Sequence, residues 1–427
     1  MRKFIVGVLT RKQGLFINSF LKYLKILVLP PLAFIFVFCL IPISFANDSY
    51  VWTSLNSALE TSADVSDSEN TDLNLESESA ILIEQNSGQV LYEMNAHEQL
   101  RPASVTKIMS ILLIMEALDE GKISLDDKIP CSENAASMGG SQIWLDVREE
   151  LSVNDMLKAI CVASANDATV ALAEYLAGSE EAFVKKMNEK AKELGMNDTT
   201  FKNCHGLDTD GHVTSSYDIA LMSRDLLTKH PSITNYTTIY MDTLRDGKSE
   251  LVNTNKLIRN YKGATGLKTG STGLALYNLS ASATRDGLSL IAVIMKAPST
   301  KLRFAEAKKL LDYGFSNYSY TEFVKKDTVL KSINVNKGIE QNVDVVFAKD
   351  CGVVMKKGME QNIEQIVSLK NSVDAPVYKG QKLGEVQYVL NGEVLSSVDI
   401  IAEKDVKKIS FISLNEKIVN SWFNLLR

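Results

Sequence analysis

Three polar motifs contain the residue types that covalent catalysis at a peptide carbonyl requires. They are Ser104 with Lys107, Ser164 with Asn166, and the consecutive residues Lys268, Thr269 and Gly270. A serine hydroxyl becomes an effective nucleophile when a nearby base takes its proton, and a lysine can be that base when burial lowers its pKa. Each motif is common by chance, so the interest lies in their combination.

Ser104 lies where an apolar helix begins, so its hydroxyl is expected near the backbone N–H groups of a helix N-terminus. Ile108, Leu112 and Met115 recur at helical spacing and predict that this helix is buried. Lys107 follows Ser104 by one turn on the same face. Burial would destabilise the Lys107 ammonium, so that its neutral amine could take the Ser104 proton. Alone, the pattern favours a serine that only caps a helix.

The glycine-rich stretch 263–273 raises the question of a phosphate loop. Such a loop needs a lysine directly after its last glycine and a helix behind it, whereas here one residue separates Lys268 from the preceding glycine and strand-like residues follow. We interpret the stretch as a strand whose Lys268 and Thr269 could bind the carboxylate of an extended peptide. Gly270 leaves room for another backbone to approach closely.

Ser164 and Asn166 lie within an otherwise apolar helical segment, 152–177. Polar residues inside a helix compete with its backbone hydrogen bonds. A break between two helical halves would point both side chains into a cleft, and a satisfied buried hydrogen bond is the simpler alternative.

The elements around these motifs predict an α+β domain. Residues 79–95 form two apolar runs around an Asn-Ser-Gly turn, and Asp286-Gly287 joins two more, both typical of hairpins. Helical segments lie between the hairpins and after the second one. We therefore expect an antiparallel sheet flanked by helices, with a helical subdomain, over 79–317. Short strand-like runs over 318–402 predict a small separate all-β domain.

The two ends of the chain carry patterns typical of an export signal and of an amphipathic helix. Residues 1–46 combine six basic residues with a long apolar run and small residues, which is typical of an export signal cut after Ala46; an uncleaved membrane helix is the alternative. The acidic residues 47–78 predict a linker. The half-apolar arc of 403–427 is typical of an amphipathic helix lying on a membrane, or docked on the protein itself. We expect an exported protein at the outer face of the cytoplasmic membrane or cell wall, peripherally anchored.

Charge and cysteine usage exclude several functions. The 427-residue chain has a formal net charge of −6, which becomes about −12 without the six basic residues of the export signal, so nucleic acid is not an expected partner. Cys131, Cys161, Cys204 and Cys351 form no CxxC pair, and the four histidines form no HExxH motif. We therefore expect no disulfide framework, no metal site and no cofactor. Cys204 and His205 are sequence neighbours, which seldom aligns a nucleophile with its base.

The three motifs occur in the order SxxK, SxN and KTG, first 60 and then 104 residues apart, which is the trio of penicillin-binding proteins and serine β-lactamases. The chain resembles the low-molecular-weight penicillin-binding proteins, which are serine-type D-Ala-D-Ala carboxypeptidases of peptidase family S11. The resemblance extends through RPASVTKIMS, VASANDA, AKELGMNDTTFKNCHGLDTDGHVTSSYDIALMSRDLL and GLKTGSTGLALYNLSASA, and covers essentially all of 79–427. It implies a β-lactamase/transpeptidase-like fold, a carboxypeptidase catalytic domain over 79–317 and a membrane-anchor helix over 403–427.

The resemblance also implies the roles of the reacting groups. Ser104 attacks the carbonyl of the penultimate D-Ala and is acylated, while Lys107 activates its hydroxyl. Ser164 relays a proton to the departing D-Ala amine. The backbone N–H groups of Ser104 and Ser271 form the oxyanion hole, where one lost donor costs on the order of 3 kcal/mol of barrier.

The remaining motif residues are implied to bind the substrate, a peptidoglycan stem peptide. Asn166 holds its backbone, Lys268 and Thr269 bind its terminal carboxylate, and Gly270 provides clearance. β-Lactam antibiotics are implied covalent inhibitors that acylate Ser104.

Three alternatives share parts of this pattern. A serine β-lactamase has the same trio, and Glu193–Asn197 superficially resembles its deacylation loop, but it would have no use for the β domain and the terminal helix. A non-catalytic β-lactam sensor would usually lack one catalytic residue. D,D-Endopeptidase or transpeptidase activity is the nearest competitor, because acceptor choice depends on the shape of the cleft.

Overall fold

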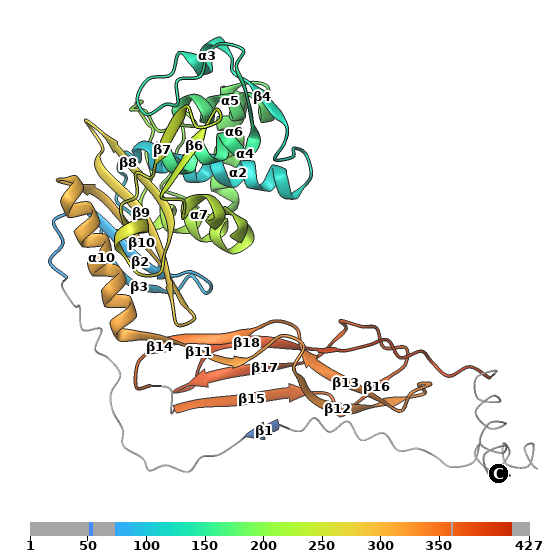
Figure 1. Cartoon of the computed structure of the whole chain (residues 1–427). Helices are drawn as coiled ribbons and strands as arrows, with labels where there is room; N and C mark the ends of the chain where they lie inside the picture. The colour runs from blue at the N-terminus through green and yellow to red at the C-terminus, as the bar shows by residue number, and fades with distance from the viewer. Residues whose placement is uncertain (1–50, 54–72, 360–361, 412–427) are drawn as a thin grey trace, which may run out of the picture.

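The computed structural model describes residues 51–53, 73–359 and 362–411, and it contains an α+β domain followed by a β domain (Figure 1). The α+β domain is built on a five-stranded antiparallel sheet with the order β3-β2-β10-β9-β8. The strands are β2 (Ser79–Glu84), β3 (Val90–Met94), β8 (Ala264–Thr272), β9 (Leu276–Arg285) and β10 (Leu288–Ala297). Strand β8, which contains the KTG motif, is an edge strand of this sheet. The predicted α+β class is confirmed.

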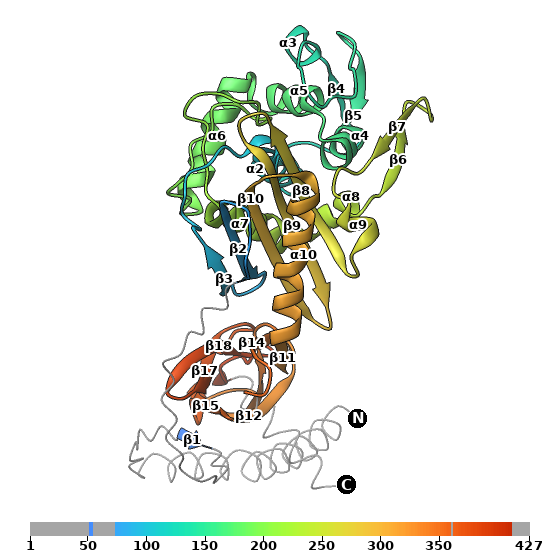
Figure 2. The same ribbon diagram turned by 90° about the vertical axis from the view of Figure 1, so that its left-hand side faces the viewer.

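Side chains that alternate along β10 divide the core of this domain into two layers. Ile291 and Val293 pack toward the helical side, in the cluster that contains α2 (Lys107–Asp119) and α7 (Ser216–Lys229). Leu290 and Ile294 pack on the opposite face, against α10 (Thr300–Asn317). Side chains of a strand point alternately to its two faces. Because both faces of β10 are covered, nearly every one of its residues is apolar. Figures 1 and 2 show α10 covering one face of the sheet and the helical lobe the other.

The helical lobe contributes the first two motifs. Its elements are η1 (Ala103–Thr106), α2, β4 (Lys128–Pro130), α3 (Glu133–Ala136), β5 (Glu150–Ser152), α4 (Val153–Lys158), η2 (Ala159–Ala163), α5 (Asn166–Ala177), α6 (Glu180–Glu193) and α7. The helical segment predicted over 152–177 is broken, as the SxN motif suggested: the π-helical turn η2 ends at Ser164, whose φ is 65°, and α5 begins at Asn166.

Short elements connect this lobe to β8. They are η3 (Pro231–Ile233), α8 (Thr234–Thr237), the hairpin β6 (Met241–Leu244) and β7 (Ser249–Val252), and α9 (Leu257–Asn260).

The β domain follows α10 directly. Its strands are β11 (Tyr318–Val324), β12 (Val329–Asn336), β13 (Asn342–Phe347), β14 (Cys351–Lys356), β15 (Ile363–Leu369), β16 (Ser372–Asp374), β17 (Lys382–Leu390) and β18 (Glu393–Ala402). Val345, Val386 and Ile400 form part of its own core. Tyr318 and Val354 instead pack in the core beneath α10, so the two domains share an apolar contact.

The structure differs from two predicted segments, the domain over 79–317 and the linker over 47–78. Leu73 is buried beside α10, and Ser77 hydrogen-bonds Glu306 on that helix, so the packed chain begins before Ser79. Strand β1 (Val51–Thr53), within the predicted linker, pairs with β15.

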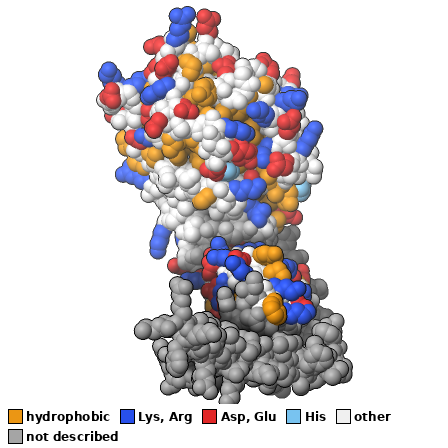
Figure 3. All heavy atoms as spheres, turned by 90° about the vertical axis from the view of Figure 1, so that its right-hand side faces the viewer, with side chains coloured by type: hydrophobic (Ala, Val, Ile, Leu, Met, Phe, Trp, Pro, Cys, Tyr) orange, Lys and Arg blue, Asp and Glu red, His pale blue; other side chains and the backbone are white. Residues whose placement is uncertain are grey.

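The predicted anchor helix cannot begin at residue 403. Val406 is buried and forms a β-bridge with Val377, and Lys408 forms one with Gly338, so residues 403–408 belong to the β domain. Residues 412–427 and the predicted export signal lie outside the described residues. Within the described ranges, no helix is long and apolar enough to cross a membrane. On the face in Figure 3, acidic and basic side chains are interspersed.

Candidate active site

Ser104 and Lys107 meet at the junction between η1 and α2. The Lys107 Nζ atom donates hydrogen bonds to Ser104 Oγ at 3.1 Å, to Asn166 Oδ1 at 2.6 Å and to the carbonyl oxygen of His205 at 2.6 Å. Ser104 lies in the short 3-10 helix that precedes α2, and Lys107 is the first residue of α2. The structure therefore brings together the serine and lysine of the first motif, as the spacing predicted.

Lys107 is fully buried among the apolar residues of α2. Burial lowers the pKa of its ammonium well below the ordinary value, and the nearby positive charge of Lys268 lowers it further. A lysine in such a site is readily deprotonated, and its neutral amine can accept a proton from an adjacent hydroxyl.

The break before α5 places the second motif beside Lys107. Asn166 accepts from Lys107 through Oδ1, and its Nδ2 donates to the carbonyl oxygen of Gly139 at 2.6 Å. The Ser164 hydroxyl is buried and has no hydrogen-bond partner among the described residues. An unpartnered buried hydroxyl lowers stability, so its presence calls for a functional explanation.

Lys268 is buried in β8 rather than displayed at an open edge, because the helical lobe covers this part of the strand. Its side chain is 1% exposed, and Nζ donates to the carbonyl oxygen of Thr269 at 3.1 Å. Burial lowers the pKa of Lys268 to about 7, and the positive charge of Arg303 contributes to the lowering. The Thr269 hydroxyl donates to Thr254 Oγ1 at 2.7 Å. The pKa of Lys268, the second cation of the site, is thus close to neutral pH.

Gly270 is where β8 touches the nucleophile segment. A Cβ atom on Gly270 would lie 2.8 Å from the Val105 nitrogen and 2.9 Å from both the Ser104 nitrogen and the Pro102 oxygen. The close approach predicted for this glycine is therefore made by η1. It also brings the segments of Ser104 and Ser271, the two predicted oxyanion donors, into contact.

The loop before α7 carries site residues that the sequence analysis missed. His205 supplies the carbonyl oxygen that binds Lys107. Gly206, with a φ of 93°, would place a Cβ atom 1.9 Å from the Ala103 oxygen, so only glycine fits behind η1. The glycine in NCHG was the available signal for this contact.

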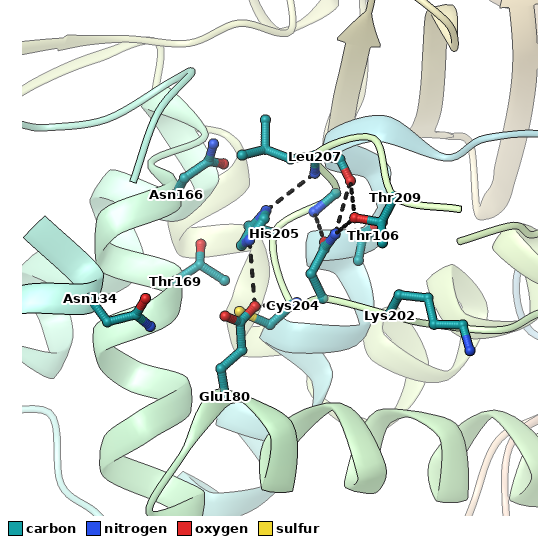
Figure 4. Close-up of polar contacts among 12 residues, drawn as sticks. Thr106, Asn134, Asn166, Thr169, Glu180, Lys202, Cys204, His205, Leu207 and Thr209 are labelled. Carbon is teal, nitrogen blue, oxygen red and sulfur yellow. Dashed lines mark hydrogen bonds and ion pairs between the residues drawn. The ribbon is translucent and has the colours of Figure 1, made fainter. Parts of the chain in front are cut away.

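The His205 ring supports the loop rather than acting as a base (Figure 4). It lies between Glu180 on α6, whose Oε1 is 3.4 Å from Nε2, and the Leu207 nitrogen, which donates to Nδ1 at 3.2 Å. Burial lowers the pKa of His205 to about 3, and burial raises the pKa of the Cys204 thiol well above its ordinary value. Both groups stay neutral at physiological pH, in keeping with a structural role.

Two charged residues that gave no sequence signal position the motifs. Arg303 on α10 donates to the carbonyl oxygens of Gly270 and Asn278, both at 3.1 Å. It thereby connects α10 to strands β8 and β9. The buried carboxylate of Asp167 accepts from the backbone nitrogens of Ile143 at 3.0 Å and Leu145 at 3.1 Å. Chemically, the arrangement offers a hydroxyl next to a depressed-pKa amine, with a second cation nearby, which suits acyl transfer.

Family models match both domains. Residues 64–299 match the Peptidase S11 model, described as D-alanyl-D-alanine carboxypeptidase, and residues 318–408 match the model described as the penicillin-binding protein 5 C-terminal domain. The chain is 47% identical over 351 residues to D-alanyl-D-alanine carboxypeptidase DacF of Bacillus subtilis, covering 81% of this chain and 90% of that protein. It is 34% identical to the enzyme DacC of Escherichia coli, covering 78% and 84%.

Solved structures align with this chain. Penicillin-binding protein 5 from Haemophilus influenzae aligns with a TM-score of 0.67 and 32% identity, over 78% of this chain and 98% of that chain. Penicillin-binding protein D2 from Listeria monocytogenes, solved with ampicillin bound, aligns with a TM-score of 0.53 and 33% identity, over 57% of this chain and 99% of that chain.

Proposed function

Because the chain belongs to the Peptidase S11 family of D-alanyl-D-alanine carboxypeptidases, we propose that it removes the terminal D-Ala of peptidoglycan stem peptides through an acyl-enzyme on Ser104. The observation that carries this proposal is the contact between Lys107 Nζ and Ser104 Oγ, 3.1 Å apart, in a site where burial lowers the lysine pKa.

In the acylation step, the Ser104 hydroxyl attacks the carbonyl carbon of the penultimate D-Ala, and the neutral Lys107 amine takes its proton. The oxygen of the tetrahedral intermediate is stabilised by the backbone N–H groups of Ser104 and Ser271. The C–N bond then breaks, and the departing D-Ala amine receives a proton by way of Ser164. Water attacks the resulting ester, the shortened peptide leaves as a carboxylic acid, and the Ser104 hydroxyl is restored.

The substrate binds as an extended strand along β8, the edge strand of the sheet, with Asn166 on the opposite wall. Its terminal carboxylate is paired with the charged form of Lys268 and with the Thr269 hydroxyl. Asn166 Nδ2 donates to the Gly139 oxygen and the Thr269 hydroxyl donates to Thr254, so a substrate bound by these groups replaces these contacts.

β-Lactams acylate the same serine. The relative from Listeria monocytogenes is solved in ampicillin-bound and cefotaxime-bound forms. Here an attack of Ser104 on the lactam carbonyl opens the ring and leaves a slowly hydrolysed ester. Glu193, the residue of the β-lactamase-like segment, ends α6 and pairs with Lys190 at 2.8 Å, which supports slow rather than rapid deacylation.

The enzyme works outside the cytoplasm, where its substrate is. The basic and apolar character of residues 1–46 supports export, and the amphipathic pattern that includes 412–427 supports peripheral anchoring on the outer face of the membrane.

The test is release of D-Ala from a defined pentapeptide that ends in D-Ala-D-Ala, measured with the purified protein. We expect release by the wild type and none by Ser104→Ala. Penicillin labelling without D-Ala release would overturn the carboxypeptidase function, and deacylation of the penicillin adduct within seconds would instead indicate a β-lactamase.

A further inference from the structure

Arg245 holds the tip of the β6–β7 hairpin against a loop of the helical lobe. It lies in the turn after β6, with a φ of 55°. Its guanidinium donates to the carbonyl oxygens of Ile143 at 2.9 Å and Trp144 at 3.2 Å. It also forms two hydrogen bonds to Glu149, at 2.6 and 3.0 Å. A guanidinium has five N–H donors, enough for the two carbonyls and both oxygens of the carboxylate, whereas an ammonium has only three.

The same loop is bound from its other side by the active-site helix α5. Asp167 accepts from the backbone nitrogens of Ile143 and Leu145, and Asn166 donates to the Gly139 oxygen. Over 143–145, α5 therefore binds backbone N–H groups while Arg245 binds backbone carbonyls. Because both kinds of backbone group are satisfied by fixed partners, the loop has a defined position.

The base of the hairpin is attached to the strand that carries the KTG motif. Thr254, two residues after β7, donates through its backbone nitrogen to the Val162 oxygen at 3.1 Å. Its hydroxyl accepts from Thr269 on β8 at 2.7 Å. Figures 1 and 2 show the β6–β7 hairpin beside the helical lobe. A continuous series of contacts thus runs from β8 through Thr254, the hairpin and Arg245 to α5.

The order of residues along β8 defines which end of the substrate lies next to this series of contacts. Under the proposed function, the terminal carboxylate lies at Lys268 and Thr269 and the scissile carbonyl faces Ser271, so the stem peptide extends toward Thr272. A group attached beyond the carboxylate would extend the other way, toward Thr254 and the hairpin.

We infer that Arg245 is a specificity-determining residue that closes the cleft beyond the terminal carboxylate and thereby restricts cleavage to peptides with a free C-terminal D-Ala. Arg245 acts by position, since it fixes the hairpin and the 143–149 loop and contacts no reacting atom. The inference rests on the proposed function, and it assigns the preference for carboxypeptidase over endopeptidase cleavage to a named contact.

The test compares two peptides that differ only beyond the scissile bond, one ending in D-Ala-D-Ala and one ending in D-Ala-D-Ala-Gly. The quantity is the ratio of their kcat/KM values for cleavage between the two D-Ala residues. We expect Arg245→Ala to lower this ratio by about tenfold or more, because cleavage of the longer peptide rises. A role confined to stability would lower both values together and leave the ratio unchanged, and that result would overturn the inference.

Arg224→Ala is the matched control. Arg224 also donates to two backbone carbonyls, those of Gln85 and Asn86, but at the β2–β3 turn, so its loss should leave the ratio as in the wild type. If Arg245→Ala does not fold, Arg245→Lys is measured instead; it keeps the charge beside Glu149 but cannot bind all the same acceptors, and should lower the ratio partially. Absence of D-Ala release by the wild type would overturn the proposed function and this inference together, whereas an unchanged ratio with normal release overturns the inference alone.

Discussion

Of the three groups that hydrogen-bond the Lys107 amine in the described part of the chain, two are obligate acceptors and one, the Ser104 hydroxyl, can give it a proton. Asn166 Oδ1 and the His205 carbonyl oxygen, each 2.6 Å from Nζ, can only accept, whereas Ser104 Oγ at 3.1 Å can donate or accept. A neutral amine has two N–H donors and one lone pair. With both donors bound to the carbonyl oxygens, the lone pair points toward the Ser104 proton.

Removal of this amine should stop acylation. We predict that Lys107→Ala slows acylation by fluorescent penicillin by about 10²–10⁴-fold, the usual contribution of a positioned base. Lys107→Arg should fail to restore the rate, because a guanidinium stays protonated. The rates are followed by gel fluorescence, with circular dichroism as the control for folding; an arginine variant with more than about a tenth of the wild-type rate would contradict the role as base.

The two lysines should give a bell-shaped pH dependence of kcat/KM. Activity requires neutral Lys107, so it rises with pH through the lowered pKa of Lys107. Carboxylate binding requires protonated Lys268, so activity falls as pH rises through the Lys268 pKa of about 7. Lys268→Arg should remove the falling limb, because burial does not deprotonate a guanidinium in this range. A falling limb that persists unchanged in Lys268→Arg would exclude Lys268 as its source.

Ser164 should matter for turnover and not for stability. Its buried hydroxyl has no partner among the described residues, so Ser164→Ala should change the free energy of unfolding by less than about 0.5 kcal/mol, or increase it. D-Ala release should nevertheless fall by about 10²-fold or more if the hydroxyl relays a proton. Thermal melting and release assays on the same preparation separate the two effects, and equal activity of variant and wild type would remove Ser164 from the mechanism.

The glycines of the KTG segment offer a steric test. Gly270→Ala would force a Cβ atom to within 2.8–2.9 Å of backbone atoms of η1, which cannot rotate away. We expect penicillin acylation to fall by at least about tenfold, because the Ser104 segment is pushed from β8. Gly273→Ala is the control, since nothing lies within 4 Å of its added Cβ atom. Equal acylation by the two variants would show that the contact between β8 and η1 is not needed.

Local pattern was sufficient to predict most of the fold and the principal site residues. The two apolar runs around the Asp286-Gly287 turn predicted the hairpin of β9 and β10, and a break at the polar residues Ser164 and Asn166 was one of the two interpretations of the helical segment before α5. These features depend on a few adjacent residues. The membrane and export predictions fall largely on residues outside the described ranges and stay predictions.

Contacts between distant segments could not be predicted in the same way. The His205 carbonyl reaches Lys107 across 98 positions, and Arg303 reaches Gly270 across 33. A backbone carbonyl carries no sequence signal, and a buried arginine looks like any charged residue of an amphipathic helix. The burial of Lys268 was missed for a related reason, because it depends on the helical lobe that covers β8.

The most direct test of the central claim is to locate the covalent intermediate. Intact-protein mass spectrometry after incubation with penicillin, followed by tandem sequencing of the digest, identifies the acylated residue. The account predicts one adduct per chain, on Ser104, which is absent in Ser104→Ala and slow to form in Lys107→Ala. An adduct on any other residue, or an undiminished adduct in Ser104→Ala, would contradict it.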